Sequence, residues 1–304
     1  MHEGSQRAVI AAFLANLGIA AAKFAAFLAT GAASMLAESV HSLADTGNQA
    51  LLLLGARRAR RGPSLQHPFG YGRERYFWAF VVALLLFSLG AIFAIVEGIE
   101  KLLNPHVIES TGWAFAVLLA AIALESFSLR TAMREANAVR GGDGWWGFVR
   151  RAKSPELPVV LLEDVGALLG LGFALVGVAL AVATGNPRFD AIGSIAIGLL
   201  LGAIAVVLAS EMKSLLIGEA ASPDVEARIR TAIESSPSVR RLIHMRTLHL
   251  GPEELLLGAK LEFAAGLDGP ALARSIDAVE AQVRAEVPEA RVIYIEPDVA
   301  RPAA

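Results

Sequence analysis

The chain has 304 residues, 55% of them hydrophobic, and a formal net charge of −2 at pH 7. This charge argues against a nucleic-acid partner, because no general surplus of Lys and Arg is present to neutralise phosphates. The sequence contains no cysteine. Disulfides, thiolate metal sites and thiol redox chemistry are therefore excluded, and any metal must be bound through nitrogen and oxygen atoms.

Six long apolar segments precede residue 219, and each is long enough to cross the hydrocarbon core of a bilayer, which takes about 20 residues. They cover residues 8–29, 32–55, 76–99, 113–133, 157–184 and 189–216. The first segment lacks a small-residue cleavage site and has the length of a full span, so we do not interpret it as a cleaved signal. The sequence predicts an all-α membrane bundle of six transmembrane helices over residues 1–218.

Basic residues are concentrated in two of the links between these segments. The link between the second and third holds Arg57, Arg58, Arg60, Arg61, Arg73 and Arg75, and the link between the fourth and fifth holds Arg134, Arg140, Arg150, Arg151 and Lys153. The other links have only Lys101 and Arg188 near their edges. The positive-inside rule then predicts a multi-pass protein with both termini in the cytoplasm, and we expect it in a bacterial inner (cell) membrane.

From residue 219 onward the composition changes to that of a small soluble domain. Ser222-Pro223 and Gly269-Pro270 each precede a stretch with helical spacing of apolar residues. Residues 242–250, 255–263 and 291–297 are typical of strands, and Gly251-Pro252 separates the first two. We predict a small α+β cytoplasmic C-terminal domain over residues 219–304, with the order αββαβ.

The second apolar segment carries polar side chains that a membrane span rarely has. They are Glu38, His41, Asp45, Asn48 and Gln49. On a helix, His41 and Asp45 lie one turn apart on the same face, so both side chains can reach one point. Ionisable groups at membrane depth cost several kcal/mol and usually mark an ion or proton path. The alternative is a set of polar groups that bond to neighbouring helices, but a His and an Asp at metal-ligand spacing favour an ion site.

Five motifs together resemble the cation diffusion facilitators, and most closely the branch similar to mitochondrial zinc transporters. In chain order they are ESVHSLADTGNQALLLLG, HPFGYGRERY, LLEDVGALLG, FDAIGSIAIG and YIEP. The resemblance covers nearly the whole chain, as six spans followed by an αββαβ domain. It implies a homodimer, embedded in lipid, that exports a divalent metal ion, usually zinc, in exchange for protons and without a resident cofactor.

The resemblance also implies which side chains bind the metal. His41 and Asp45 match the family's ligand pair on the second span, and Asp164 matches the second member of the pair on the fifth. The first member of that pair falls on Val160, which cannot bind metal. Glu163 is the nearest replacement, although consecutive helical residues point about 100° apart, so Glu163 and Asp164 share an ion only across an irregular turn.

Other groups are candidates for the vacant fourth ligand. They are Glu38, Asn48 and a water molecule. Three side chains and a water form an acceptable tetrahedral zinc site, whereas Asn48 and a water favour a harder ion such as manganese. We thus expect a metal site of His41, Asp45, Asp164 and Glu163.

Histidines elsewhere are weaker candidates for metal ligands. His67 matches one ligand of a peripheral site of the family, but Tyr71 replaces its usual histidine companion, and we interpret HPFGYGRER as mainly structural. His244 and His249 lie an odd number of residues apart on a predicted strand, so they are expected to face opposite sides. The sixth segment holds Gly193, Gly198 and Gly202, which permit close contact between helices.

The function we predict is metal/proton antiport by alternating access, because the ligands bind metal only when deprotonated and metal and protons therefore compete. One alternative is a manganese or iron exporter of the same family, and another is a non-transporting membrane metal sensor. A membrane enzyme that uses a His-Asp pair as a base is a third. The sequence lacks a serine or cysteine nucleophile in an elbow motif, so we do not expect an enzyme.

Overall fold

The computed structural model describes residues 33–105, 111–142 and 144–299, together with isolated positions between residues 10 and 28. The predicted first span lies mostly outside the described residues. The chain forms two compact units. Unit one contains residues up to 57 and residues 75–213, and unit two contains residues 58–74 and 214–304.

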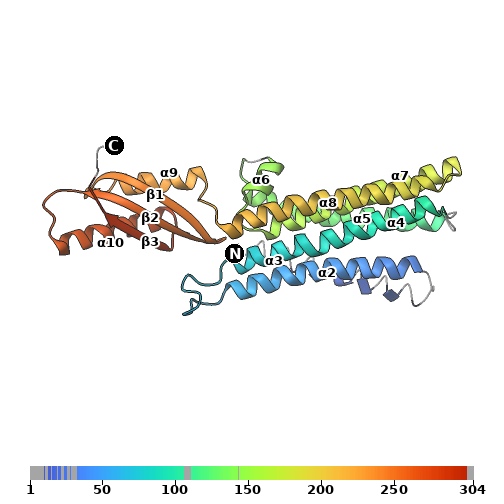
Figure 1. Cartoon of the computed structure of the whole chain (residues 1–304), viewed down its shortest axis with the longest axis horizontal. Helices are drawn as coiled ribbons and strands as arrows, with labels where there is room; N and C mark the ends of the chain where they lie inside the picture. Colours follow the sequence, from blue (N-terminus) through green and yellow to red (C-terminus); the bar gives the residue numbers. More distant parts are fainter. Residues whose placement is uncertain are drawn as a thin grey trace. The chain divides into compact units, whose positions relative to one another are not determined.

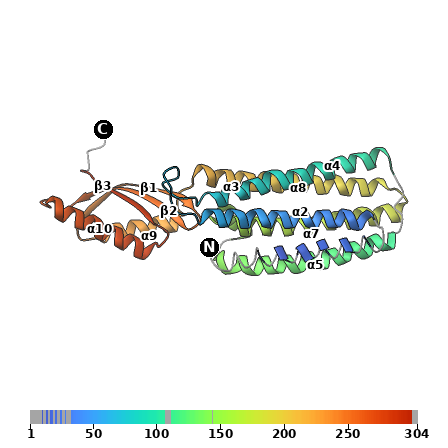
Figure 2. The ribbon, with the colours of Figure 1, turned by 90° about the horizontal axis from the view of Figure 1, so that it is seen from below.

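Unit one is built from helices, and the long ones run side by side (Figures 1 and 2). They are α2 (Ala33–Ala59), α3 (Glu74–Val81), α4 (Ser88–Leu103), α5 (Thr111–Val139), α6 (Trp145–Arg151), α7 (Glu156–Thr184) and α8 (Arg188–Ile217). The second predicted span forms α2. The third predicted span corresponds to α3 together with α4. The fourth, fifth and sixth predicted spans correspond to α5, α7 and α8.

Four helical stretches in the described part of the chain are long and apolar enough to cross a membrane. They are Glu74–Leu103, Phe115–Val139, Glu156–Thr184 and Arg188–Ile217. Large apolar side chains on these helices are exposed, among them Phe93, Phe127 and Val206 at 70%, 74% and 67%. Helices that expose apolar side chains in this way are suited to contact with lipid rather than water. The prediction of a helical membrane domain is confirmed for these four spans.

The third span contains a π-helical segment that the sequence did not predict. It covers Val82–Phe87 and joins α3 to α4 without a break. One-turn π segments inside α-helices are uncommon and are often found at functional sites.

Glycines bring α8 close to two neighbouring helices. A Cβ atom at Gly198 would lie 2.8 Å from the carbonyl oxygen of Ala91, and one at Gly98 would lie 2.9 Å from that of Ala191. A Cβ atom at Gly193 would lie 3.0 Å from the carbonyl oxygen of Phe173 on α7. The predicted role of Gly193 and Gly198 in close helix contact is confirmed.

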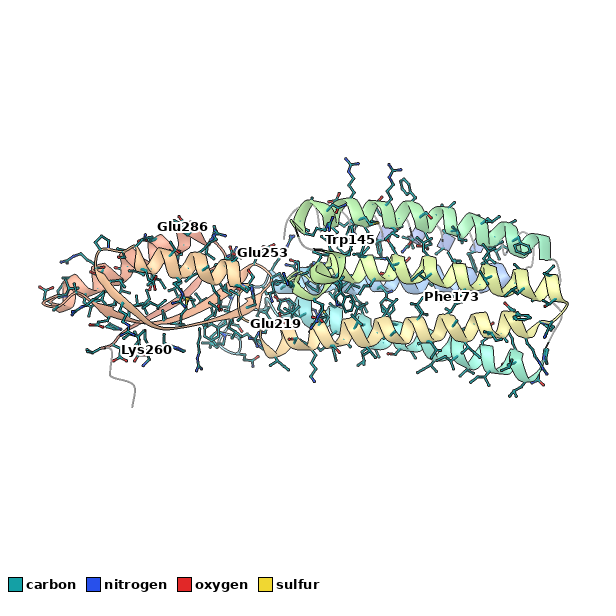
Figure 3. All side chains as sticks on the ribbon, turned by 90° about the horizontal axis from the view of Figure 1, so that it is seen from above. Trp145, Phe173, Glu219, Glu253, Lys260 and Glu286 are labelled. Atoms are coloured by element: carbon teal, nitrogen blue, oxygen red, sulfur yellow. The ribbon has the colours of Figure 1, made fainter. Side chains whose placement is uncertain are left out.

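A short helix, α6, lies in the basic link between the fourth and fifth spans, where no helix was predicted from the sequence. The Arg140 guanidinium lies 4.4 Å from the centre of the Trp145 ring, in a cation–π contact at the start of this helix. Phe148 and Val149 are buried. Figure 3 shows Trp145 and, on α7, Phe173 at different levels of unit one.

Unit two contains the predicted αββαβ order. It consists of α9 (Pro223–Glu234), β1 (Val239–Gly251), β2 (Glu254–Phe263), α10 (Gly269–Glu286) and β3 (Val292–Pro297). The strand order is β1-β2-β3, with β1 antiparallel and β3 parallel to β2. Both helices cover the same face of the sheet (Figure 2). Ser222 caps α9 by accepting a hydrogen bond from the Val225 amide at 3.4 Å, as the sequence predicts.

The core of unit two follows from the alternation of side chains along β2. Leu255, Leu257, Ala259 and Leu261 are buried, together with apolar residues of both helices. The residues between them, including Lys260, face the other side of the sheet. Figure 3 shows Lys260 on the opposite side of the sheet from Glu286, at the end of α10.

The two histidines of β1 differ in burial as their spacing predicts. His244 is exposed and accepts a hydrogen bond from Nε of Arg246 at 2.9 Å. His249 is buried at 6% exposure. The two side chains therefore lie on different faces and form no pair.

The link between α2 and α3 packs against the hairpin end of β1 within unit two. A Cβ atom at Gly72 would lie 2.8 Å from the Leu250 carbonyl oxygen, and one at Gly251 would lie 2.9 Å from the Gly72 Cα. Only glycine fits at either position without a shift of backbone. The ring of His67 packs on that of Tyr71, with centroids 4.6 Å apart. These contacts support the structural interpretation of the HPFGYG motif.

Candidate metal centre

Helix α2 carries the candidate ligands His41 and Asp45. The backbone is helical at both positions, so their spacing of four residues places them on the same side of α2. Their side chains, and that of Glu38, lie outside the described part of the structure. That both bind one ion therefore stays a prediction.

Helix α7 carries the other two candidate ligands, Glu163 and Asp164, about two turns after its first residue, and both side chains are buried. Val160, Glu163 and Asp164 are exposed by only 4%, 9% and 6%. The helix is continuous from Glu156 to Thr184. Two adjacent carboxyl groups are thus held away from solvent within an apolar span, where charged groups are costly and rarely retained without a function.

Glu163 is bonded to α2. Its Oε1 atom accepts a hydrogen bond from Nδ2 of Asn48 at 3.0 Å and another from Nε2 of Gln49 at 3.5 Å. Gln49 in turn accepts a hydrogen bond through Oε1 from Nδ2 of Asn16, at 3.3 Å. Asn48 and Gln49 are 5% and 2% exposed. A buried polar network therefore joins α2 to α7 and extends to the first predicted span.

Asp164 contacts a different helix. Its Oδ2 atom accepts a hydrogen bond from the Ser128 hydroxyl of α5 at 3.0 Å. Glu163 and Asp164 thus have partners on α2 and on α5, in line with the angle of about 100° between consecutive residues of a regular helix. No irregular turn brings the two carboxyl groups together, because α7 is regular there.

The contact of Ser128 with Asp164 was not anticipated from the sequence. Serines within spans commonly bond to the carbonyl four residues earlier in their own helix, as Ser126 does here with Ile122. Spacing alone therefore does not distinguish Ser128 from Ser126. Gln49 was recognised as an unusual polar residue, but its bond to Glu163 depends on how α2 packs against α7.

The described residues include no group of three or more His, Cys, Asp and Glu side chains placed to hold a metal ion. Among the four expected ligands, only Glu163 and Asp164 have described side chains. The expected site therefore depends on the side chains of His41 and Asp45.

A buried ion pair lies at the end of the bundle where α3 and α7 begin. Nε and Nη2 of Arg75 donate to the two carboxylate oxygens of Glu156, at 2.5 and 2.7 Å. The residues are 6% and 2% exposed. Glu156, Val160 and Asp164 follow one another at four-residue intervals on one face of α7, so the pair lies about 12 Å along the axis from Asp164. From the sequence, Arg75 is only one of the basic residues of the loop.

The family of the protein is identified from the transmembrane part of the chain. Residues 9–217 match the model of the cation efflux transmembrane domain. The chain belongs to the cation efflux family. The resemblance to cation diffusion facilitators is thereby confirmed, and the chain is a member of a transporter family rather than an enzyme.

Several named relatives are similar over most of this cation efflux protein. The mitochondrial proton-coupled zinc antiporter SLC30A9 of Xenopus laevis is 36% identical over 255 residues, which are 83% of this chain and 45% of the relative. Metal tolerance protein C4 of Arabidopsis thaliana is 31% identical over 261 residues, 85% of this chain and 57% of the relative. Zinc transporter ZitB of Escherichia coli (strain K12) is 25% identical over 257 residues, 84% of this chain and 76% of the relative.

This cation efflux protein spans about half the length of the first two of these relatives. The family assignment and the four spans make it a multi-pass integral membrane protein. The relatives' names include mitochondrial and bacterial proteins, so the comparisons do not support the expected bacterial inner membrane in particular.

Proposed function

We propose that this protein exports a divalent metal ion, zinc in the first place, as a metal/proton antiporter that works by alternating access. Three relatives carry zinc or metal in their names, and one is named a proton-coupled antiporter. The observation that carries the proposal is the bond between Asn48 and Glu163. Asn48 lies three residues after Asp45 and Glu163 directly before Asp164, so this bond supports a location of the α2 ligand pair beside Asp164.

In this proposal His41, Asp45 and Asp164 bind the ion, and a water molecule completes the shell, because the regular helix at Glu163 directs that carboxyl group away from Asp164. A nitrogen ligand with carboxylate oxygens suits Zn²⁺, which binds such donors in tetrahedral sites. Each ligand must lose its proton to bind metal, so a proton and the metal ion compete for the same groups. A site that is open to each side of the membrane in turn then exchanges metal for protons.

The orientation follows from the basic links. We place both termini and the two arginine-rich links on the cytoplasmic side, with residues 1–218 as a transport domain of six spans. Metal then enters from the end of the bundle where Arg75 and Glu156 pair. Residues 219–304 form the cytoplasmic domain, and the functional unit is a homodimer in the lipid bilayer.

Zinc flux into proteoliposomes under an imposed pH gradient tests this function. We expect Asp45→Ala and Asp164→Ala each to abolish flux while the purified protein stays monodisperse. Glu211→Ala is the matched control, because Glu211 pairs with Arg150 at 3.3 Å in an exposed contact and should leave flux unchanged. Normal flux in Asp45→Ala would exclude the proposed site.

A manganese or iron exporter is the second candidate function. The buried carbonyl oxygen of Asn48 favours it, because oxygen ligands suit harder ions such as manganese. The same flux assay with Mn²⁺ and Fe²⁺ decides between the metals. Metal-dependent structural change without flux of any of the three ions would instead indicate a sensor.

A further inference from the structure

We propose that Asn48 and Glu163 form a second, weaker cation site, displaced from the proposed transport site toward the end of the bundle with the basic links. This inference rests on the proposed function, since the ion it binds is the transported metal. Asn48 is C-terminal to Asp45 on α2, and Glu163 is N-terminal to Asp164 on α7. Both displacements are toward the helix ends that adjoin the arginine-rich links.

The first observation is an unsatisfied oxygen. Oδ1 of Asn48 is buried and has no hydrogen-bond partner among the residues that the structure describes. A buried acceptor without a partner costs about 1–3 kcal/mol, and such atoms in folded proteins usually have a ligand, an ion or a water as their explanation. The side chain as a whole is only 5% exposed.

The second observation is the position of that oxygen beside a carboxylate. Nδ2 of Asn48 donates to Oε1 of Glu163 at 3.0 Å, and Oδ1 belongs to the same small planar amide. Rotation of the amide by half a turn exchanges the donor and the acceptor. The amide oxygen and the carboxylate then both face an ion that lies between α2 and α7.

Gln49 shows why Asn48 is the amide that serves as a ligand. Both residues donate to the same Glu163 oxygen, at 3.0 Å from Asn48 and 3.5 Å from Gln49. The oxygen of Gln49, however, already accepts a hydrogen bond from Asn16 at 3.3 Å. Of these two amides, only Asn48 has an acceptor oxygen to offer to a cation.

The chemistry of the site matches an ion in passage. One carboxylate and one amide oxygen form a hard donor set, which is typical of sites for Mg²⁺ and Mn²⁺ that retain several waters. Few protein ligands give weak binding, and weak binding allows an ion to leave again. A partly hydrated divalent ion from the cytoplasm would thus bind Asn48 and Glu163 before it reaches the nitrogen ligand of the transport site.

The test counts bound Mn²⁺ by electron paramagnetic resonance, using the full chain purified in detergent. The comparison starts from Asp45→Ala, which removes a transport-site ligand, and adds one change at a time. We expect Asp45→Ala to bind less Mn²⁺ than wild type and to retain a weaker class of site. Adding Asn48→Leu weakens that class about tenfold or more, because an oxygen ligand to a charged group is lost.

The matched control is Asp45→Ala with Gln49→Met, which removes the other amide donor to Glu163 and should retain the weaker class. Asp45→Ala with Asn48→Asp keeps an oxygen at the site and should also retain it. Size-exclusion chromatography and circular dichroism confirm that each variant folds.

Three results would overturn the second site: no Mn²⁺ bound by Asp45→Ala, no effect of Asn48→Leu, or equal losses from Asn48→Leu and Gln49→Met. Equal binding by wild type and Asp45→Ala, with a loss on adding Asn48→Leu, supports the second site and contradicts the proposed transport site instead.

Discussion

The guanidinium of Arg75 and the carboxylate of Glu156 meet in a two-point contact inside unit one, with N–O distances of 2.5 and 2.7 Å. The pair joins the first turn of the third span to the first turn of the fifth, which carries Asp164. Planar two-point contacts between Arg and a carboxylate are stronger and more directional than single hydrogen bonds. The pair therefore fixes where α7 begins relative to α3.

Removal of one partner of this pair should be costly. Arg75→Ala leaves Glu156 buried without its cation, and we expect a loss of about 3–5 kcal/mol in the free energy of unfolding. Arg75→Lys keeps the charge but loses the fork geometry, so its loss should be intermediate. Thermal unfolding in detergent measures both effects.

The double variant Arg75→Leu/Glu156→Leu distinguishes charge burial from packing. It should recover most of the lost stability, because a buried apolar pair has no unpaired charge. Arg150→Ala breaks an exposed pair and should cost about 1 kcal/mol or less. A double variant as unstable as Arg75→Ala would contradict this explanation.

Ser128 should tune the affinity of the proposed metal ligand Asp164. Its hydroxyl donates to Oδ2 of Asp164, and groups that orient a metal ligand typically change affinity by about 10–100-fold when they are removed. We expect Ser128→Ala to weaken zinc binding in that range, measured by titration calorimetry in detergent. Ser126→Ala removes a hydroxyl that donates to the Ile122 carbonyl of its own helix and has no contact with Asp164 in the described part of the chain, so it should leave the affinity unchanged. Equal effects of the two serine variants would argue against an orienting role for Ser128.

The close packing of the α2–α3 link against β1 should depend on the absence of a side chain at Gly72. A methyl group there would lie 2.8 Å from the Leu250 carbonyl oxygen, so Gly72→Ala must displace the link. We expect faster amide hydrogen exchange over residues 61–73 and at the end of β1. Gly62→Ala is the control, because a Cβ atom at Gly62 meets nothing within 4 Å. Unchanged exchange in Gly72→Ala would show that the contact is not tight.

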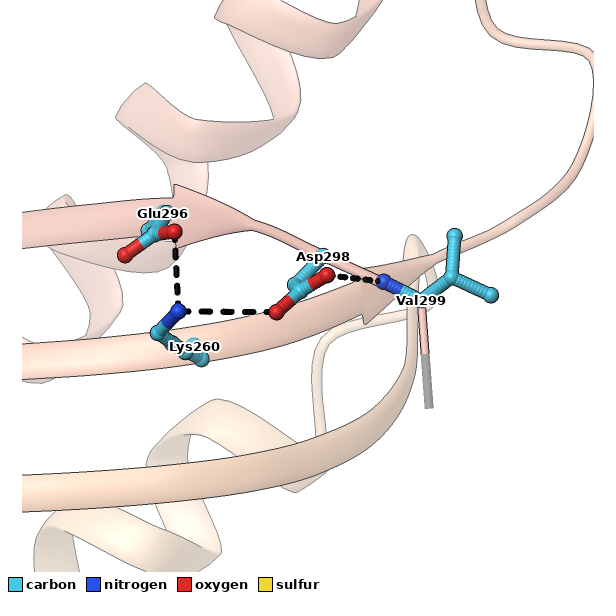
Figure 4. Close-up of polar contacts among 4 residues, drawn as sticks. All are labelled: Lys260, Glu296, Asp298 and Val299. Carbon is cyan, nitrogen blue, oxygen red and sulfur yellow. Dashed lines mark hydrogen bonds and ion pairs between the residues drawn. The ribbon is translucent and has the colours of Figure 1, made fainter. Parts of the chain in front are cut away.

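Lys260 should titrate above its ordinary value. Its ammonium donates to Glu296 at 2.9 Å and lies 3.5 Å from Asp298 (Figure 4). The hydrogen bond to Glu296 raises the pKa of Lys260 above 10.5, with further support from the charges of Glu296 and Asp298. The stabilisation is therefore fully present below pH 10.5 and is lost as the pH rises through the raised pKa.

Lysine-selective NMR of the full chain checks this direction. Glu296→Gln should lower the pKa of Lys260 toward 10.5, because the charged hydrogen-bond acceptor that raises it is replaced by a neutral amide. A pKa that does not move in Glu296→Gln would contradict the assignment. The residue is exposed, so we expect little change in overall stability.

Patterns within single elements were predictable from the sequence. Apolar length identified the spans that form α5, α7 and α8, and alternation identified β2, because both patterns repeat along one element. The cap at Ser222 followed from local chemistry in the same way. The π-helical turn at Val82–Phe87 was missed, since its residues are as apolar as those of a regular helix.

Contacts between elements were not predictable in the same way. The bonds of Glu163 to Asn48 and of Asp164 to Ser128 depend on which helices surround α7. Arg75 appeared in the sequence as one arginine among several in a basic loop. It is buried against Glu156, which lies 81 positions further along the chain. Sequence periodicity does not predict contacts between residues so far apart.

Proton movement driven by a zinc gradient is the most direct test of metal/proton exchange by this protein. Proteoliposomes that contain the protein and a pH-sensitive dye receive a zinc gradient without an imposed pH gradient. We predict proton flow opposite to zinc flow in wild type and neither flow in Asp45→Ala, since both ions compete for the same ligands. Zinc flow without proton flow in wild type, or proton-coupled zinc flow in Asp45→Ala, would contradict metal/proton exchange at this site.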